Sequence, residues 1–430
     1  MKIKTITLGC KVNQYESQAI LQIFEERGHQ PVQHGETPDV ILLNSCTVTA
    51  ESDHKVRQAL RRARRQAPEA VIVLTGCMAQ AFPEKTAELA DADLIIGNKE
   101  KSTIPDRVEE FLRNRQRIIQ VPEFKSGEPF ESMMVSTFAE HTRAFVKIED
   151  GCNRFCSYCI IPYARGRVRS KDPKELKLEL QQLAHNGYRE VVLTGINLSA
   201  YGQEFGLHLC DAVEIACEID GIERVRLGSL EPEQLTPDVI ARLAKQPKFC
   251  PQFHLSLQSG CDRTLKAMNR HYTAAEYRKI VHDLHTAFEN ASVTTDVMVG
   301  FSGETEEDFE ESLAFVQSIG FAKVHVFPYS RRPGTRAYDA PGVVPNAEKE
   351  RRARKMIDAT EETRKAFFQN QLGRIETVLA ETILPNGTTE GYTMNYTPVY
   401  AENMKPGTIY RVRLTGTDDN GCIGKVVSSL

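Results

Sequence analysis

Apolar and polar positions alternate with two different periods over the first 118 residues. Short, mostly apolar runs typical of buried strands occupy residues 2–8, 40–44, 71–75 and 94–96, and stretches of helical periodicity follow them. Strands that alternate with helices indicate a parallel sheet with right-handed crossovers. We therefore predict an α/β domain with a doubly wound parallel sheet over residues 1–118.

The same alternation returns after a connector. Residues 119–140 have no clear period and contain Pro122, Gly127 and Pro129, which are typical of loops. Between residues 141 and 370, six further strand-like runs alternate with helical stretches, and they favour a partial (β/α)6 barrel over a closed eightfold one. The predicted strands lie near residues 144–148, 190–193, 224–227, 253–257, 293–299 and 323–327.

The pattern changes once more near the end of the chain. Short alternating strands, including residues 392–396 and 397–402, are separated by Asn-Gly and Pro-Gly turns. We predict a small all-β barrel of the oligonucleotide-binding sort for residues 371–430, and a fragment of a β-sandwich fits the same pattern.

Composition narrows the class of protein. A chain of 430 residues with 41% apolar and 26% charged residues is typical of a soluble globular protein with about two to four domains. No apolar run approaches the ~20 residues that cross a membrane, so we expect a cytoplasmic protein with no membrane partner. The net charge of −4 neither favours nor excludes a nucleic-acid partner.

Three cysteines stand in one short loop directly after the predicted strand 144–148. Cys152, Cys156 and Cys159, here the loop triad, have the spacing Cys-x3-Cys-x2-Cys, and the loop supplies no fourth ligand. Structural zinc sites use four protein ligands, and iron–sulfur clusters are normally held by four thiolates. Three thiolates therefore predict a cluster with one iron left open for a reactive partner.

A second set of cysteines is spread over the N-terminal domain. Cys10, Cys46 and Cys77, here the N-terminal triad, each follow a predicted strand, and the carboxyl ends of parallel strands meet at one edge of the sheet. A single such cysteine is more often a core residue, but three at the same position predict a second three-thiolate site. The remaining cysteines lack cluster spacing and are expected in the core: Cys210, Cys217, Cys250, Cys261 and Cys422.

Two longer strings carry a family resemblance. The string Gly-Cys-Asn-Arg-Phe-Cys-Ser-Tyr-Cys-Ile-Ile-Pro-Tyr-Ala-Arg-Gly, residues 151–166, resembles the radical S-adenosylmethionine (SAM) methylthiotransferase family. The string Leu-Gly-Cys-Lys-Val-Asn-Gln-Tyr-Glu-Ser, residues 8–17, resembles its MtaB type, which acts on threonylcarbamoyladenosine in tRNA. The resemblance implies an N-terminal methylthiotransferase domain, a radical SAM barrel and a C-terminal TRAM barrel. It also implies two 4Fe–4S clusters, one that binds SAM on the loop triad and one that carries sulfur on the N-terminal triad.

The activity that the resemblance implies is a transferase reaction on tRNA. Two SAM molecules and the two clusters would insert sulfur and methylate it at carbon 2 of N6-threonylcarbamoyladenosine, at position 37 next to the anticodon. The implied partners are the tRNA anticodon stem-loop, an electron donor such as flavodoxin or ferredoxin, and a sulfur source. The residues expected to hold SAM are Tyr158, Asn197, Ser229, Glu231, Ser256 and Gln258.

Groups of arginines favour an RNA substrate. The stretch 54–65 is densely cationic, although a solvated helix face accounts for it equally well. We predict a cationic surface for the anticodon loop from Arg61, Arg62, Arg64, Arg65, Arg165, Arg167, Arg169, Arg331 and Arg332. The alternatives are the same chemistry on isopentenyladenosine in tRNA or on a ribosomal-protein side chain, and a non-catalytic iron–sulfur or zinc protein that binds RNA.

Overall fold

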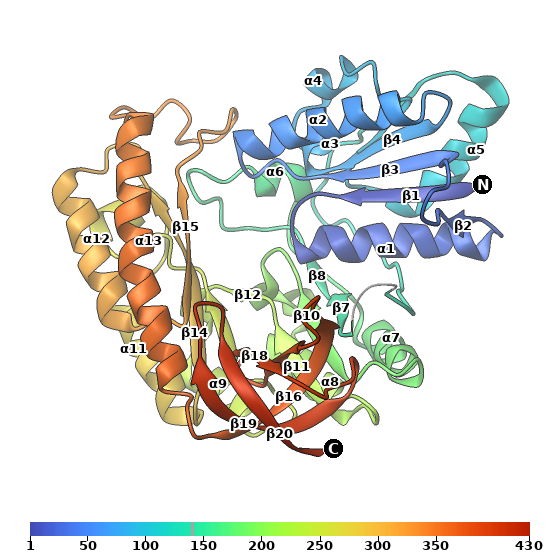
Figure 1. The fold of residues 1–430 in the computed structure, drawn as a ribbon. Helices are drawn as coiled ribbons and strands as arrows, with labels where there is room; N and C mark the ends of the chain where they lie inside the picture. The colour runs from blue at the N-terminus through green and yellow to red at the C-terminus, as the bar shows by residue number, and fades with distance from the viewer. Residues whose placement is uncertain (139–141) are drawn as a thin grey trace.

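The computed structural model describes residues 1–138 and 142–430 and divides into three packed parts (Figure 1). An N-terminal α/β domain is followed by a partial β/α barrel and by a small β barrel at the C-terminal end. The predicted boundary at residues 140–141 falls outside the described residues. Within the described ranges, no helix is long and apolar enough to cross a membrane.

The N-terminal domain is built on a parallel six-stranded sheet of order β2-β1-β3-β4-β5-β6. The strands are β1 (Lys2–Thr7), β2 (Gln30–Pro31), β3 (Val40–Ser45), β4 (Val71–Gly76), β5 (Leu94–Ile96) and β6 (Ile118–Gln120). Helices α1 (Lys11–Glu26) and α5 (Ile104–Asn114) cover one face, and α2 (Ala50–Gln66) covers the other (Figure 1). Neighbouring strand residues point to opposite faces, so Leu42 belongs to the core under α1 and Ile41 to the core under α2. The predicted doubly wound sheet is confirmed, and the short strands β2 and β6 extend it at its two edges.

The middle domain is a barrel of parallel strands in two consecutive sheets, β11-β10-β7 and β12-β13-β14-β15. The strands are β7 (Ala144–Lys147), β10 (Glu190–Thr194), β11 (Arg224–Leu227), β12 (Ser229–Leu230), β13 (Gln252–Leu255), β14 (Ser292–Val299) and β15 (Lys323–Pro328). Among the described strands, β7 and β15 do not pair with each other, so the barrel is open. The predicted partial barrel is confirmed.

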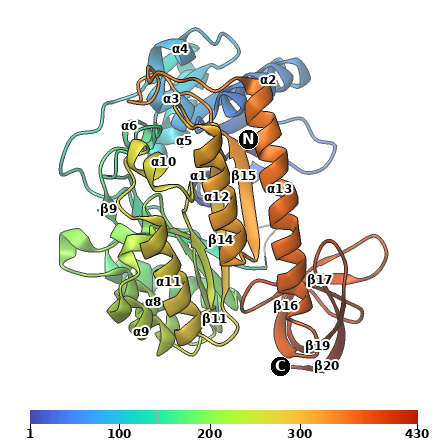
Figure 2. The ribbon, with the colours of Figure 1, turned by 90° about the vertical axis from the view of Figure 1, so that its left-hand side faces the viewer.

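Helices cover the outside of this barrel. They are α7 (Pro173–His185), α8 (Leu209–Glu218), α9 (Pro237–Ala244), α11 (Ala274–Ala287), α12 (Glu306–Ile319) and α13 (Asn346–Gln369). Helix α9 was not predicted, because its eight residues are too few to show a clear period. Helix α13 packs along β15 and leads into the C-terminal domain (Figure 2).

One hydrophobic core runs from the N-terminal domain into the barrel. Tyr15 and Phe24 of α1 belong to the same buried cluster as Val146 of β7 and Leu180 of α7. Each large apolar side chain buried in this way contributes about 1.5–3 kcal/mol. Helix α1 is therefore buried on both sides, and the N-terminal domain is held against the barrel by packing as well as by the chain.

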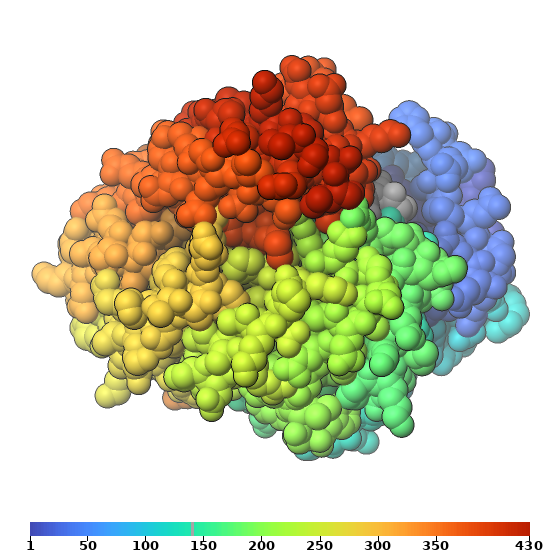
Figure 3. Space-filling view, turned by 90° about the horizontal axis from the view of Figure 1, so that it is seen from below, coloured from blue at the N-terminus to red at the C-terminus, as the bar shows by residue number. Residues whose placement is uncertain are grey.

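The C-terminal domain is a closed barrel of order β16-β17-β18-β20-β19, as predicted. Its strands are β16 (Ile375–Ile383), β17 (Thr389–Thr393), β18 (Pro398–Ala401), β19 (Ile409–Thr417) and β20 (Cys422–Ser429). It lies directly against the middle domain (Figure 3). Arg224 of β11 donates to the Thr377 carbonyl at 2.7 Å, and Arg226 donates to the Met394 carbonyl at 2.6 Å.

The prediction of a strand over residues 392–396 is confirmed only at Tyr392 and Thr393. β17 ends at Thr393, and the chain then turns, with Tyr396 at φ +67°. The Tyr396 amide donates to the Thr393 carbonyl at 3.0 Å and closes this turn, and Arg226 donates to the carbonyl groups of Thr393 and Met394. The turn brings the Tyr396 ring to 4.9 Å from the Arg226 guanidinium.

Candidate active site

The loop triad follows the carboxyl end of the first barrel strand. The two-residue strand β8 (Glu149–Asp150) leads into Gly151, which has φ +86°. A Cβ at this position would lie 2.0 Å from the Arg167 carbonyl oxygen, so the close approach of the two segments requires glycine. The Cys152 amide donates to the Gly166 carbonyl at 3.0 Å and fixes the start of the loop.

The other end of the loop is held by the segment after α10 (Asp262–Ala267). The Ser157 amide donates to the Met268 carbonyl at 2.9 Å, and Asn269 Nδ2 donates to the Phe155 carbonyl at 3.1 Å. Arg270 Nη1 donates to Cys156 Sγ at 3.3 Å, and its Nη2 lies 2.5 Å from Glu231 Oε2. Arg270 thus places a buried positive charge on one sulfur of the loop triad.

Polar groups without partners gather at the ends of the neighbouring strands. Within the described residues, Glu149 Oε1, Asn197 Oδ1 and Gln258 Oε1 are buried and accept no hydrogen bond. Gln258 also has a left-handed φ of +70°. Buried acceptors are rarely left unsatisfied, and backbone strain of this kind concentrates at functional sites. The edge therefore fits a ligand that brings N–H and O–H donors, as the amino group and ribose of SAM would.

The remaining residues predicted to hold SAM lie at the same edge with different surroundings. Tyr158 packs edge-on against Phe301, with ring centroids 6.4 Å apart. The Ser256 carbonyl accepts from Arg270 at 3.0 Å, whereas Ser229 is exposed to a cavity. Their contact with SAM stays a prediction.

The N-terminal triad lies where three parallel strands end, after β1, β3 and β4. A Cβ on Gly9 would come within 3.4 Å of Cys46 Sγ, so the loop before Cys10 passes directly over Cys46. Asn13 links the other two cysteines, because its Oδ1 lies 3.8 Å from Cys10 Sγ and 2.7 Å from Arg165, whose Nε donates to Cys77 Sγ at 3.4 Å. The sheet thus brings these cysteines to one edge, and their role as ligands stays a prediction.

The Cys46 and Cys152 thiols are poorly ionised. Burial, with the neighbouring Cys77, raises the pKa of Cys46 to about 11, and burial raises the pKa of Cys152 to about 12. A metal centre removes such protons when it binds. Over residues 1–138 and 142–430, no three His, Cys, Asp or Glu side chains are close enough to hold a single ion. A cluster spreads its thiolates over several irons, so the donor set of three cysteines suits a cluster.

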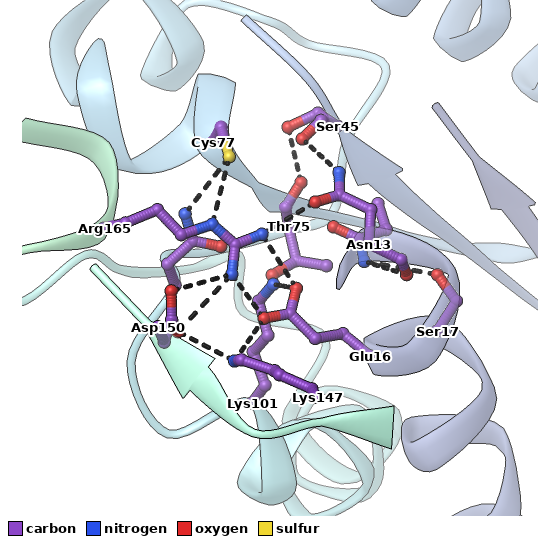
Figure 4. A network of polar contacts seen from close by, with 12 residues as sticks. Asn13, Glu16, Ser17, Ser45, Thr75, Cys77, Lys101, Lys147, Asp150 and Arg165 are labelled. Carbon is purple, nitrogen blue, oxygen red and sulfur yellow. Dashed lines mark hydrogen bonds and ion pairs between the residues drawn. The ribbon is translucent and has the colours of Figure 1, made fainter. Parts of the chain in front are cut away.

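A buried network of charges joins the N-terminal triad to the barrel (Figure 4). Glu16 of α1 lies 2.5 Å from Arg165 and 2.7 Å from Lys147, and it also pairs with Lys101. Asp150 lies 2.7 Å from Lys147. Burial alone would raise the pKa of the Glu16 carboxyl, but these cations outweigh it and hold that pKa well below 4.5.

The network carries more positive than negative charge. Asp150 also pairs with Arg169 at 3.0 Å, so four cations share two carboxylates, and every one of these side chains is at most 8% exposed. Buried charges are normally compensated. Arg165 reaches Cys77, so an anionic thiolate cluster at the N-terminal triad would supply the missing negative charge.

Several arginines predicted at an RNA-binding surface are buried. Arg165 and Arg169 lie in the charge network, and Arg332 pairs with Asp53 at 2.6 Å. The prediction of a surface position is wrong for these three, because each is buried against a carboxylate. This carboxylate comes from the N-terminal domain for Arg165 and Arg332 and from the neighbouring strand β8 for Arg169. Arg64 is half-buried against Asp93 at 2.7 Å, and Arg331 is half-buried and donates to the Tyr338 carbonyl. The exposed members of the predicted set are Arg61, Arg62, Arg65 and Arg167.

A cavity of about 710 Å³ lies where the three domains meet. The N-terminal domain contributes Cys10 and Lys11, and the C-terminal domain contributes Tyr396. The barrel supplies the remaining wall: Arg143, Phe145, Val192, Arg226, Leu227, Gly228, Ser229, Gln252, His254, Thr294, Asp296, Lys323 and His325. The volume lies in the range of small-molecule and cofactor sites.

Sequence reasoning missed some of these residues. Glu149 could have been found, since it directly precedes the cysteine loop at a strand end. Arg270 could not have been found from the sequence, because no motif marks it and only folding brings it next to Cys156. Lys11 and Lys323 look like ordinary surface lysines in the sequence, and only the cavity singles them out.

Two family models match the chain. The Radical SAM superfamily model matches residues 146–316, and the model of Uncharacterized protein family UPF0004 matches residues 2–97.

Curated proteins of known type are similar over nearly the whole chain. The threonylcarbamoyladenosine tRNA methylthiotransferase MtaB of Bacillus subtilis (strain 168) is 36% identical, over 98% of this chain and 91% of that protein. The protein of the same name from Aquifex aeolicus is 37% identical over 87% and 91%. The tRNA-2-methylthio-N(6)-dimethylallyladenosine synthase of Pelotomaculum thermopropionicum is 34% identical over 88% and 86%.

Solved structures share the fold at low identity. The radical S-adenosylmethionine methyltransferase TsrM from Kitasatospora setae superposes with a TM-score of 0.58 at 13% identity, over 79% of this chain and 74% of that chain. At this identity the likeness concerns the fold alone.

The charge network gives a first test. We expect Glu16→Gln to destabilise the protein by about 3–5 kcal/mol, because it leaves buried cations without their carboxylate. The chain has no tryptophan, so unfolding in denaturant is followed by circular dichroism. Glu25→Gln, on an exposed position of the same helix, is the matched control and should stay within about 0.5 kcal/mol of wild type. Equal stability of both variants would contradict the role given to Glu16.

Proposed function

The chain belongs to the radical SAM tRNA methylthiotransferase family, and on that premise we propose that it attaches a methylthio group to carbon 2 of N6-threonylcarbamoyladenosine at position 37 of tRNA. The observation that carries the proposal is the shared cavity. Cys10 of the N-terminal triad, strands of the radical SAM barrel and Tyr396 of the C-terminal barrel line one space. A nucleoside in that space would reach the N-terminal triad and the barrel at once.

The two cysteine triads would each hold a 4Fe–4S cluster. When bound, the clusters and SAM supply the electron, the radical and the methylated sulfur that the reaction requires. The loop triad would hold the cluster that binds SAM, and the N-terminal triad the cluster that carries sulfur. An electron donor such as flavodoxin or ferredoxin and a source of sulfur would complete the reaction.

The chain's own residues would orient SAM at the strand ends. Asn197 and Gln258 would accept hydrogen bonds through their unpaired side-chain oxygens. Glu149 would act in the same way, and burial with the nearby Asp150 raises the pKa of its carboxyl well above 4.5, so it can also carry a proton. Tyr158 and Phe301 would offer an aromatic corner for the adenine ring.

An aromatic and cationic group beside the loop triad suits single-stranded RNA. The Arg167 guanidinium lies 4.6 Å from the centre of the Phe155 ring, and Phe155 packs edge-on against Tyr163 at 6.0 Å. Tyr163 is 49% exposed. Bases of single-stranded loops stack on such side chains, so we assign this group to the anticodon loop.

Nucleoside analysis tests the activity. We expect tRNA incubated with reconstituted enzyme, SAM, sulfide and a reductant to gain a methylthio mass on threonylcarbamoyladenosine by mass spectrometry. A tRNA that carries the dimethylallyl base in the same sequence is the control and should gain none. The opposite result would assign the chain to the dimethylallyl type, and no gain on either RNA would overturn the proposed reaction.

Metal analysis tests the two triads. We expect about eight irons per chain after anaerobic reconstitution, and about four when Cys152, Cys156 and Cys159 are all changed to alanine. The matched control changes the core residue Cys250 to alanine, and it should keep about eight irons. One zinc per triad would contradict the assignment of clusters.

The exposed arginines of α2 test the path of the RNA. Changing Arg61, Arg62 and Arg65 to glutamine should weaken tRNA binding and make its dependence on salt shallower, by a slope of about two. Lys245→Gln, on an exposed position outside the barrel, is the control. Unchanged affinity and slope in the triple variant would show that the arginines of α2 are solvated side chains that do not contact the RNA.

A further inference from the structure

Four cations face the cavity between the three domains, and two of them are already neutralised. Arg226 lies 2.7 Å from Glu190, and Arg143 lies 3.0 Å from Glu381. Both guanidinium groups also lie about 5 Å from the Tyr396 ring, at 4.9 and 4.8 Å. The charges of these two arginines are therefore already neutralised by carboxylates, so the arginines would attract an anionic ligand only weakly.

The two lysines of the cavity have no such partners. Lys11 is the first residue of α1, and Lys323 is the first residue of β15, so they enter the cavity from different domains. In the part of the chain that the structure describes, neither lysine forms an ion pair, and Lys11 Nζ lies 5.9 Å from the centre of the Phe145 ring. Among the described residues that line the cavity, Asp296 is the one carboxylate, and it lies 3.3 Å from His254.

This balance of charge calls for an anionic ligand. Both lysines are exposed at the cavity, where their ammonium groups are available to a ligand. A charge-assisted hydrogen bond from such a group to an anion is about twice as strong as a neutral one. The rest of the wall suits a nucleoside, because it adds the aromatic rings of Phe145 and Tyr396 and the polar groups of Gln252 and Thr294.

The anion can be a backbone phosphate or a carboxylate on the base, and the place of the cavity favours the carboxylate. Cys10 lines it, so its occupant lies beside the N-terminal triad, where the reacting base belongs. Phosphates lie on the outside of an RNA loop and match the outward-facing Arg61 and Arg65. The threonylcarbamoyl substituent carries a carboxylate and a hydroxyl, whereas a dimethylallyl substituent carries neither.

We propose that Lys11 and Lys323 form a subsite for the carboxylate of the N6 substituent, and that this subsite selects the threonylcarbamoyl base. The inference rests on the proposed function and adds the residues that determine specificity. Without these two cations, the cavity would bind the dimethylallyl base as tightly as the threonylcarbamoyl base.

Three stem-loop RNAs that differ only at position 37 test the subsite. One carries threonylcarbamoyladenosine, the second carries its methyl ester, and the third carries dimethylallyladenosine. With reconstituted wild-type enzyme, we expect fluorescence anisotropy to show about tenfold tighter binding of the acid than of the ester. Lys323→Gln should remove most of this preference by weakening the acid alone, and Lys11→Gln should do the same. Lys245→Gln is the matched control and should keep the full preference.

The outcomes separate the subsite from the function. Equal losses for acid and ester would assign the lysines to phosphates and overturn the subsite, and so would an unchanged preference in both variants. Iron content and circular dichroism check folding, and Lys323 provides the cleaner variant because Lys11 adjoins Cys10. If wild-type enzyme modifies the acid-bearing RNA while the variants keep their preference, only the subsite fails. If it modifies only the dimethylallyl RNA, the proposed function fails.

Discussion

The burial of Arg165 is the constraint on which the arrangement of the domains depends. Its guanidinium contacts Glu16 of the N-terminal domain, Asp150 of the barrel and the Cys77 sulfur. A buried ion network adds little net stability, because desolvation offsets much of the attraction, but breaking it is costly. Its effect is to fix one relative position of the two domains. Both cysteine triads are then held in one rigid frame, since Asp150 immediately precedes the loop that bears the loop triad.

In each triad, one cysteine sulfur accepts a hydrogen bond from a buried arginine. Arg165 donates to Cys77 of the N-terminal triad, and Arg270 donates to Cys156 of the loop triad. Each arginine is in turn held by a carboxylate, Glu16 or Glu231. Hydrogen bonds to cluster sulfurs favour the more negative, reduced state and so tune the reduction potential. In the proposed function, these two arginines would therefore set how readily each cluster accepts an electron.

The sequence predicted the layers of the fold because those layers follow periods that single segments carry. The position of Cys10, Cys46 and Cys77 at one sheet edge was also predictable, because the carboxyl ends of the strands in a parallel sheet lie at the same edge. It failed for Arg165 and Arg169, which stand beside the exposed Arg167 in one basic string. The Glu16 carboxylate that covers Arg165 lies 149 residues away, and charge alone does not tell an inside arginine from an outside one. The strand predicted at 392–396 ends early because the chain turns at residues 393–396, and Arg226 of another domain holds that turn.

In the proposed function, substrate selection by the cavity also depends on contacts between distant parts of the chain. In that function, the cysteine triads would perform chemistry that the threonylcarbamoyl and dimethylallyl types both need, so the triads would not distinguish the two bases. Discrimination must come from the walls, and each domain contributes to them. Arg143 and Arg226 hold the Tyr396 ring at the cavity together with the stacked ring of Tyr392, and both arginines pair with Glu190. The C-terminal barrel thereby contacts the wall of the cavity through cation–π interactions. In the proposed function, RNA that binds to the C-terminal barrel would therefore affect the same residues that line the cavity around the base.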